Sequence, residues 1–139
     1  MFINKRIVRI EWGDCDPAGI VFYPRYFAFF DASTQHLFEA AGFPKQELRK
    51  KFDLVGYPMV DTRAKFIVPS KFGEDIRIES HISEFRRSSF DVLHQVFKGE
   101  ILAIEAWETR VLAGKDPENP DKIKSRPIPE EIINKFKNS

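Results

Sequence analysis

One long apolar helix stripe, with strand patterns before and after it, constrains the fold of this chain more than any other feature. Apolar residues recur at spacings of three and four from Phe27 to Ala41, and Gly42 then ends the pattern. Alternation with a period of two predicts strands at residues 2–12, 57–68, 76–82, 88–98 and 100–112. The helix stripe must be buried, and an antiparallel sheet is the large surface available to cover it. The pattern therefore predicts an α+β fold with a sheet wrapped around one central helix, rather than βαβ units.

The chain is predicted to form one domain over residues 1–139, because its length suits one hydrophobic core and no repeat or linker interrupts it. Residues 45–52 are predicted to form a short helical turn. The segment 114–139 is charged and holds four of the nine prolines. This tail is predicted to be a loop that closes with a short helix at residues 129–137.

Composition excludes several classes of function. A net charge of +1 argues against a general nucleic-acid binder, for which clustered positive charge is expected. The N-terminal residues 1–12 alternate charged and apolar side chains and do not form a signal peptide. No stretch approaches the roughly 20 apolar residues that cross a bilayer, so no membrane partner is expected. One cysteine fits a reducing cytosol. We therefore expect a soluble, cytoplasmic protein.

The segment DCDPAG, which begins at Asp14, has the spacing of the first half of a calcium-binding loop. The twelfth position of such a loop, normally Glu, would be Arg25, and a cation cannot be a ligand of a cation. The three histidines are scattered and Cys15 is alone, so zinc is not supported either. No metal and no cofactor are predicted. Two flanking carboxylates would also disfavour the thiolate form of Cys15, which argues against a cysteine nucleophile.

Two interpretations of Asp14 and Asp16 remain open from the residues alone. Acids placed before a helix commonly form Asx-turns or cap the helix. Alternatively, a carboxylate beside a helix N-terminus can act on a carbonyl whose oxygen the free N–H groups polarise. In this second interpretation Phe22, Tyr23 and Tyr26 would line the site.

Residues 13–33, GDCDPAGIVFYPRYFAFFDAS, closely resemble the signature of the 4-hydroxybenzoyl-CoA thioesterase family, which are hotdog-fold acyl-CoA thioesterases. The segments GYPMV (56–60) and EFRRSSF (84–90) follow in the order expected for that family. The similarity extends from about residue 7 to residue 112. It implies a five-stranded antiparallel sheet around one long central helix. It also implies a homodimer or homotetramer with the active site at the subunit interface, acting on an acyl-CoA substrate.

The resemblance also implies roles for individual residues. Asp16 matches the catalytic carboxylate, which acts as nucleophile or general base on the thioester carbonyl. Tyr23 matches the residue whose backbone N–H binds the carbonyl oxygen. Asp31 matches an acid that positions the substrate, with an exposed helix acid as an equal alternative. Tyr57 departs from the family pattern: it stands where a smaller residue is expected, at the start of the strand beside the acyl group. The positions that contact the phosphates of coenzyme A are matched by Arg86, Arg87 and Ser89.

The substrate favoured by the resemblance is an aromatic acyl-CoA such as 4-hydroxybenzoyl-CoA, because Pro24 matches the branch of the family that acts on aryl thioesters. A short or medium aliphatic acyl-CoA is the second choice. A non-catalytic acyl-CoA binding module is a further alternative, against which the presence of Asp16 argues. A dehydratase or hydratase is disfavoured, since that chemistry usually needs a histidine and the nearest, His36, lies far along the helix.

Overall fold

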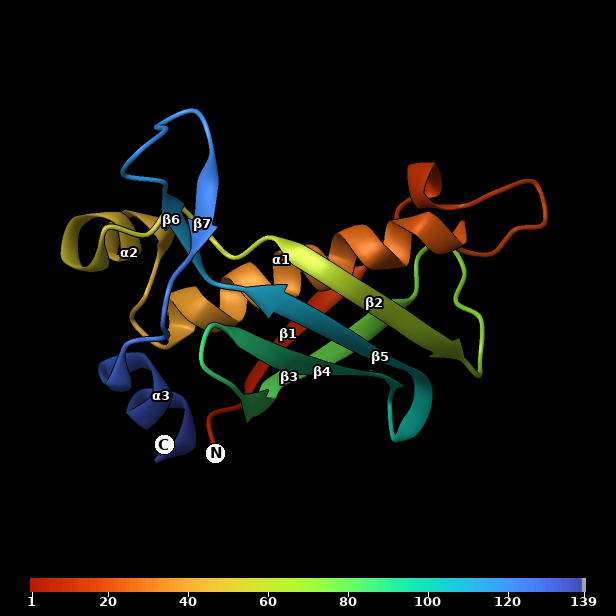
Figure 1. Ribbon diagram of the computed structural model, residues 1–139. Coiled ribbons are helices and arrows are strands. Elements are labelled where there is room, and N and C mark those ends of the chain that lie inside the picture. The colour runs from red at the N-terminus through yellow and green to blue at the C-terminus, as the bar shows by residue number, and fades with distance from the viewer. Residues whose placement is uncertain (139) are drawn as a thin grey trace.

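The computed structural model describes residues 1–138, which form a curved antiparallel sheet around the long helix α1, Tyr23–Ala40 (Figure 1). The sheet has five strands in the order β1-β3-β4-β5-β2. Their bounds are Asn4–Arg9 for β1, Met59–Phe66 for β2, Asp75–Phe85 for β3, Ser89–Lys98 for β4 and Ile101–Val111 for β5. The predicted α+β architecture is thus confirmed. No helix among the described residues is long and apolar enough to cross a membrane.

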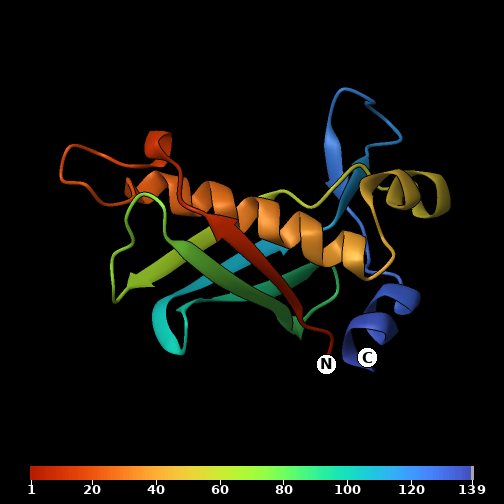
Figure 2. The same cartoon turned by 180° about the vertical axis from the view of Figure 1, so that it is seen from behind.

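Helix α1 crosses the inner face of the sheet, as the reverse view shows (Figure 2). It starts after Phe22, whose backbone is extended, and Pro24 occupies the first turn, where its missing N–H needs no partner. Gly42 follows the helix with φ of +94°, a left-handed conformation that favours glycine. The buried side chains are Tyr26, Phe30, Ser33, Thr34, Leu37 and Phe38. The predicted stripe is therefore correct, apart from Phe27, which is half-buried.

The edge strand β2 differs from the other strands because almost nothing covers it. It pairs with β5 on one side, and its other edge has no neighbouring strand within the described chain. Seven of its eight residues are exposed, including Val60 at 63% and Phe66 at 48%. The alternation that predicted this strand is present, but its apolar side chains remain open to solvent in the single chain.

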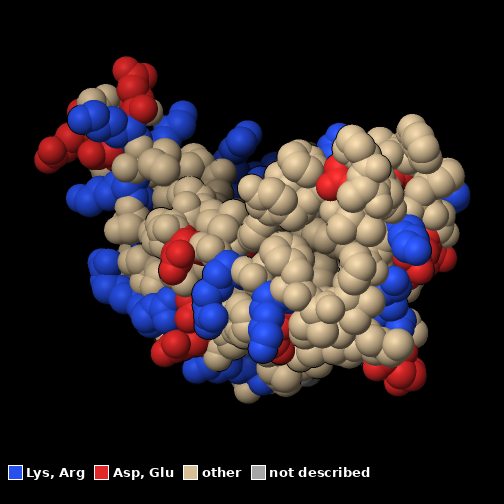
Figure 3. All heavy atoms as spheres, turned by 90° about the vertical axis from the view of Figure 1, so that its right-hand side faces the viewer, with Lys and Arg blue, Asp and Glu red and all other residues tan. Residues whose placement is uncertain are grey.

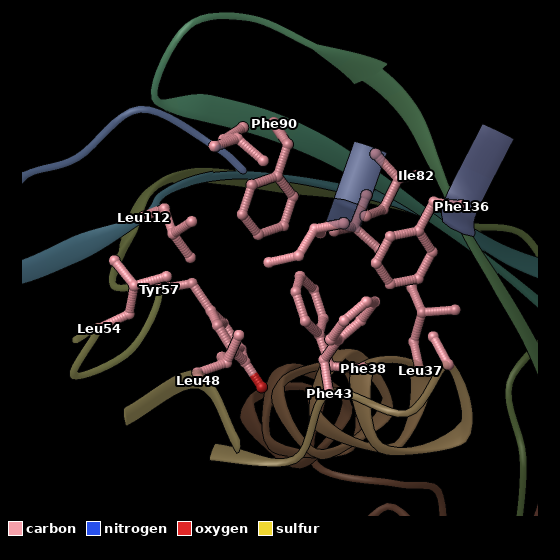
Figure 4. Packing of buried hydrophobic residues seen from close by; sticks show 14 residues of the cluster. Leu37, Phe38, Phe43, Leu48, Leu54, Tyr57, Ile82, Phe90, Leu112 and Phe136 are labelled. Carbon is pink, nitrogen blue, oxygen red and sulfur yellow. The ribbon is translucent and has the colours of Figure 1, made fainter. Parts of the chain in front are cut away.

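A cluster of aromatic side chains packs in the core at the C-terminal half of α1 (Figure 4). The ring of Phe38 stacks on Tyr57, with 4.5 Å between the centroids, and lies 5.1 Å from the ring of Phe136. The ring of Phe90 on β4 lies 5.4 Å from that of Phe38 and 6.2 Å from that of Tyr57. This cluster joins α1, the sheet and the C-terminal helix, and it explains part of the high phenylalanine content of the chain.

In the C-terminal segment the predicted short helix at residues 129–137 is confirmed, whereas the part before it differs from the predicted loop. The segment contains a two-stranded hairpin, β6 (Ala113–Lys115) and β7 (Ile123–Ser125), and then helix α3 (Glu130–Lys137). The predicted helical turn at 45–52 is helix α2, Lys45–Phe52. Gly114 has no room for a side chain, because a Cβ would lie 2.8 Å from the Asp53 carbonyl oxygen and from the Arg126 guanidinium carbon. The short strands were missed because three residues are too few to show an alternation.

Candidate active site

The loop between β1 and α1 begins with a short 3₁₀ turn, Trp12–Asp14, in which Asp14 has a structural role. The Asp14 side chain accepts a hydrogen bond of 2.9 Å from the Glu11 N–H. Its carbonyl oxygen accepts one of 2.8 Å from the Phe22 N–H, which brings the two ends of the loop together. Of the two interpretations of the acids, turn formation therefore describes Asp14.

Asp16 is held by one carboxylate oxygen and leaves the other free. Its Oδ1 accepts a hydrogen bond of 2.9 Å from the Ala18 N–H, an Asx-turn, whereas Oδ2 makes no hydrogen bond to any of residues 1–138. The Asp16 N–H donates to the Ile20 carbonyl at 3.0 Å, and Gly19 completes the turn with φ of +84°. The loop thus fixes the direction of this side chain and keeps one oxygen available.

Asp16 lines an open cavity of about 370 Å³ at the N-terminal end of α1. The aromatic wall of this cavity is formed by Trp12 and Phe72, whose rings meet edge to face at 5.6 Å. The remaining lining residues are Cys15, Pro17 and Gly19. Figure 3 faces this end of the molecule and shows a broad uncharged surface with scattered charged groups. A carboxylate beside apolar walls suits chemistry on a neutral, apolar substrate group.

The first residue of α1, Tyr23, offers a free backbone donor at the same end of the helix. Phe22 provides no side-chain cap, and the Arg25 N–H donates to the Phe22 carbonyl at 2.8 Å. Pro24 has no N–H, and within residues 1–138 the Tyr23 N–H has no hydrogen-bond acceptor. This N–H lies at the positive end of the helix dipole, a position that favours a partly negative oxygen atom as its acceptor. The Tyr23 side chain, 59% exposed, borders an apolar pocket of about 170 Å³ that Phe66 also lines.

Asp31 and Tyr57 lie together, but away from Asp16. Asp31 lies eight positions after Tyr23 on α1, which corresponds to roughly 12 Å along the helix axis. Asp31 and Tyr57 line a separate pocket of about 240 Å³, where Asp31 Oδ1 accepts a hydrogen bond of 2.8 Å from Arg110. The Tyr57 ring is buried in the core, and this burial raises the pKa of its hydroxyl.

Of the predicted coenzyme A residues, Arg86 and Arg87 lie in the turn between β3 and β4, and Ser89 begins β4. This turn is at the opposite end of the molecule from the Asp16 loop (Figure 1). Arg86 is already engaged: it makes two hydrogen bonds to Asp91, at 2.6 and 3.1 Å, and one to Ser89 at 2.8 Å. The bonds to Asp91 raise the pKa of Arg86 and lower that of Asp91. The guanidinium of Arg87 is exposed, and no acid within residues 1–138 forms an ion pair with it. Its Nη1 donates a hydrogen bond of 3.0 Å to the Ser88 hydroxyl, and no carboxylate within the described residues neutralises its charge.

Two buried charged residues, Glu108 and Arg110, were not predicted from the sequence; they are 1% and 5% exposed. They lie on β5, and alternation places them on the same face as Ile104, Ala106 and Leu112. Two charges on the apolar face of a strand are the signal that could have identified them. Within the described residues, no cluster of three or more His, Cys, Asp or Glu side chains suits a metal ion.

The sequence and the structure of this chain both match known proteins. Residues 10–136 match the model of the thioesterase-like superfamily. The 4-hydroxybenzoyl-CoA thioesterase of Pseudomonas sp. strain CBS-3 is 36% identical over 132 residues, which cover 90% of this chain and 91% of that protein. Its solved structure superposes with a TM-score of 0.87 over 97% of this chain and 99% of that chain, at 33% identity. The structure of the gentisyl-coenzyme A thioesterase BH1999 gives a TM-score of 0.80 at 30% identity, over 96% of this chain and 98% of that chain.

These findings confirm the hotdog fold and the enzyme class, acyl-CoA thioesterase, that were predicted from the sequence. The matched range extends beyond residue 112 and includes most of the C-terminal segment. The chain belongs to the thioesterase-like superfamily and, within it, to the 4-hydroxybenzoyl-CoA thioesterase family that its residues 13–33 resemble.

Proposed function

We propose that this chain hydrolyses an aromatic acyl-CoA thioester to the free acid and coenzyme A, with Asp16 as the catalytic carboxylate. The observation that carries the proposal is the pairing of two free groups at one end of α1. Asp16 has one oxygen anchored and one available, and the Tyr23 N–H has no partner within residues 1–138. A carboxylate and a fixed N–H donor are what acyl transfer from a thioester requires.

The reaction follows from the chemistry of these two groups. The Tyr23 N–H binds the thioester carbonyl oxygen and stabilises the negative charge that develops on it as the carbonyl carbon is attacked. Asp16 either attacks that carbon, which gives an anhydride that water then hydrolyses, or removes a proton from an attacking water molecule. In both routes the C–S bond breaks, coenzyme A leaves as its thiolate, and the acid is released.

An aromatic acyl group is supported by the walls of the site and by the relatives. Trp12 and Phe72 border Asp16, and Tyr23 and Phe66 border the neighbouring apolar pocket. Two relatives that match at 30% identity or more are named for hydroxylated aromatic thioesters. In this proposal Asp31 accepts a hydrogen bond from a ring hydroxyl, Tyr57 supports the pocket wall, and Arg87 contacts a phosphate of coenzyme A.

The proposed site needs more than one copy of the chain. The Asp16 loop, the Asp31 pocket and the Arg87 turn occupy three separate places on the single chain, so one protomer cannot bring them to one substrate. The uncovered edge of β2, with Val60 and Phe66 exposed, suits pairing with a second copy. We therefore propose a homodimer, or a homotetramer built from it, with the active site at the subunit interface.

The experiment that tests the function is release of free thiol from a panel of CoA thioesters by wild type, Asp16→Asn and Asp14→Asn. The panel contains 4-hydroxybenzoyl, benzoyl, phenylacetyl, butyryl and decanoyl esters. Asp16→Asn should abolish turnover, because an amide is neither basic nor nucleophilic. Asp14→Asn is the matched control, since its amide oxygen can still accept the Glu11 hydrogen bond and keep the turn.

Each outcome has a distinct meaning. Preference for the aliphatic esters would keep the mechanism and reject the aromatic substrate. Full activity of Asp16→Asn would remove Asp16 from the mechanism. Binding of the esters without hydrolysis of any would identify an acyl-CoA binding module in place of an enzyme.

A further inference from the structure

A chain of polar side chains crosses the apolar core between α1 and strands β3, β4 and β5. Ser80 on β3, His94 on β4 and Glu108 on β5 are each at most 1% exposed. The Ser80 hydroxyl lies 2.7 Å from His94 Nδ1, and His94 Nε2 lies 3.3 Å from Glu108 Oε1. The Thr34 hydroxyl of α1 donates to the same Glu108 oxygen. The Glu108 carboxylate is therefore held from both the sheet and the helix.

Glu108 in turn holds Arg110. The Arg110 Nε and Nη2 atoms donate to the two Glu108 oxygens at 3.0 and 3.1 Å, and Nη1 donates to the Tyr57 carbonyl at 3.1 Å. Nη2 also donates to Asp31 Oδ1 at 2.8 Å. The Arg110 side chain is 5% exposed, whereas that of Asp31 is 65% exposed. This series of buried, hydrogen-bonded side chains therefore ends at the surface carboxylate of Asp31.

Stability alone does not account for this arrangement, because buried ion pairs are often no more stabilising than apolar side chains of the same volume. What the arrangement supplies is geometry. The guanidinium of Arg110 is fixed by Glu108 and Tyr57, and it fixes Asp31 Oδ1. Asp31 Oδ2 makes no hydrogen bond within residues 1–138, and Asp31 lines the pocket of about 240 Å³.

We propose that Arg110, held by Glu108, is a positioning residue that orients Asp31 so that its free oxygen accepts a hydrogen bond from a hydroxyl on the acyl group. This inference rests on the proposed function, in which Asp31 contacts the acyl group. A site built to pair with a hydroxyl rejects an analogue that lacks it, because a polar group is then left unpaired. The enzyme therefore prefers hydroxylated aromatic acyl groups to unsubstituted ones.

The test compares 4-hydroxybenzoyl-CoA with benzoyl-CoA, which differ in that hydroxyl alone. We expect Arg110→Met to lower kcat/KM for the hydroxylated ester about 10- to 100-fold more than for benzoyl-CoA. Asp31→Asn should reduce the same preference, and combining the two should add little, because both act on one contact. Arg110→Lys keeps the charge but not the planar fork, so it should restore only part of the preference.

The matched control is Arg77→Met, because Arg77 pairs with Glu79 at 2.9 Å on β3, outside this chain of contacts. Arg77→Met should keep the preference. If Arg110→Met does not fold, Arg110→Lys carries the comparison.

Equal losses on both esters would show that Arg110 only supports the fold, and would overturn the proposal. Wild type that hydrolyses both esters equally well would overturn it and leave the thioesterase function intact. Hydrolysis of no CoA ester would refute the proposed function, and this inference with it.

Discussion

The Arg87 carbonyl oxygen accepts a hydrogen bond of 2.8 Å from the Ile128 N–H, which ties the turn between β3 and β4 to the segment before α3. A second tie joins the chain ends, because the Phe2 N–H donates to the Phe136 carbonyl at 2.9 Å. The C-terminal segment therefore supports the turn that carries Arg87. Unfolding of the C-terminal segment would therefore also disturb the proposed coenzyme A contact at Arg87.

Removing the main apolar anchor of α3 should destabilise the whole protein. The Phe136 side chain is 2% exposed and packs against Phe38, so Phe136→Ala should lower the free energy of unfolding by about 3–4 kcal/mol. Urea denaturation measures this loss. The control is the neighbouring exposed residue: Lys137→Ala should stay within about 0.5 kcal/mol of wild type. Equal effects of the two changes would show that α3 is not part of the core.

The two arginines of the β3–β4 turn should behave differently. Arg87→Ala should raise KM for CoA esters more than it lowers kcat, as expected for a contact that is equal in ground and transition states. Arg86→Ala should chiefly lower thermal stability, because Arg86 is bonded to Asp91 and Ser89. Steady-state kinetics, with free coenzyme A as inhibitor, separate the two. An unchanged KM in Arg87→Ala would place the phosphates elsewhere.

Glu108 should make stability depend on pH in the acid range. Burial opposes its ionisation, but hydrogen bonds from His94 and Arg110 outweigh burial and lower its pKa from 4.5 to about 2. Because the folded-state pKa is the lower one, this stabilisation is complete above the unfolded-state value. It is lost as the pH falls from about 4.5 towards about 2. Its full size is on the order of 3 kcal/mol.

The measurement is urea denaturation of wild type and Glu108→Gln at pH 6, 4 and 3. The amide cannot ionise, so the wild type should be more stable at pH 6, and this advantage should shrink at the lower values. An advantage of the same size at all three values would show that the Glu108 charge does not contribute.

Charge on the open edge of β2 should separate the subunits. Val60→Asp should convert the proposed dimer to a monomer, measured by sedimentation, and should abolish turnover, because each proposed site draws on both copies. Ile7→Asp is the matched control: Ile7 is 64% exposed, similar to Val60 at 63%, but lies on β1 at the opposite edge of the sheet. A wild-type protein that is monomeric and fully active would refute the interface site.

Periodic patterns in the sequence predicted the regular elements well. The stripe from Phe30 to Ala41 is buried, and all five strands of the sheet lie where alternation predicts them. The hairpin at residues 113–125 was missed, since its strands have three residues each and follow no pattern. The length of a pattern, its period and the residues that flank it depend only on residues near one another in the sequence, so they predict local elements.

Partnerships between distant residues could not be predicted in the same way. The sequence shows that Asp14 and Asp16 precede a helix, but not which of them closes the turn and which keeps an oxygen free. It also does not show that Asp31 meets Arg110, 79 positions away, because that contact depends on how β5 lies against α1. The resemblance to a family had pointed to Asp16, but spacing alone does not separate the two acids, and the fold shows the hydrogen bonds in which they differ.

The free donor at the start of α1 belongs to the main chain, and this has a consequence for mutagenesis. Replacing the Tyr23 side chain by any residue except proline leaves the N–H in place. An alanine scan of the loop would therefore detect the carboxylate of the pair and miss its partner. Tyr23→Pro removes the donor but also the side chain, whereas an ester in place of the Phe22–Tyr23 amide removes the donor alone and measures what it contributes.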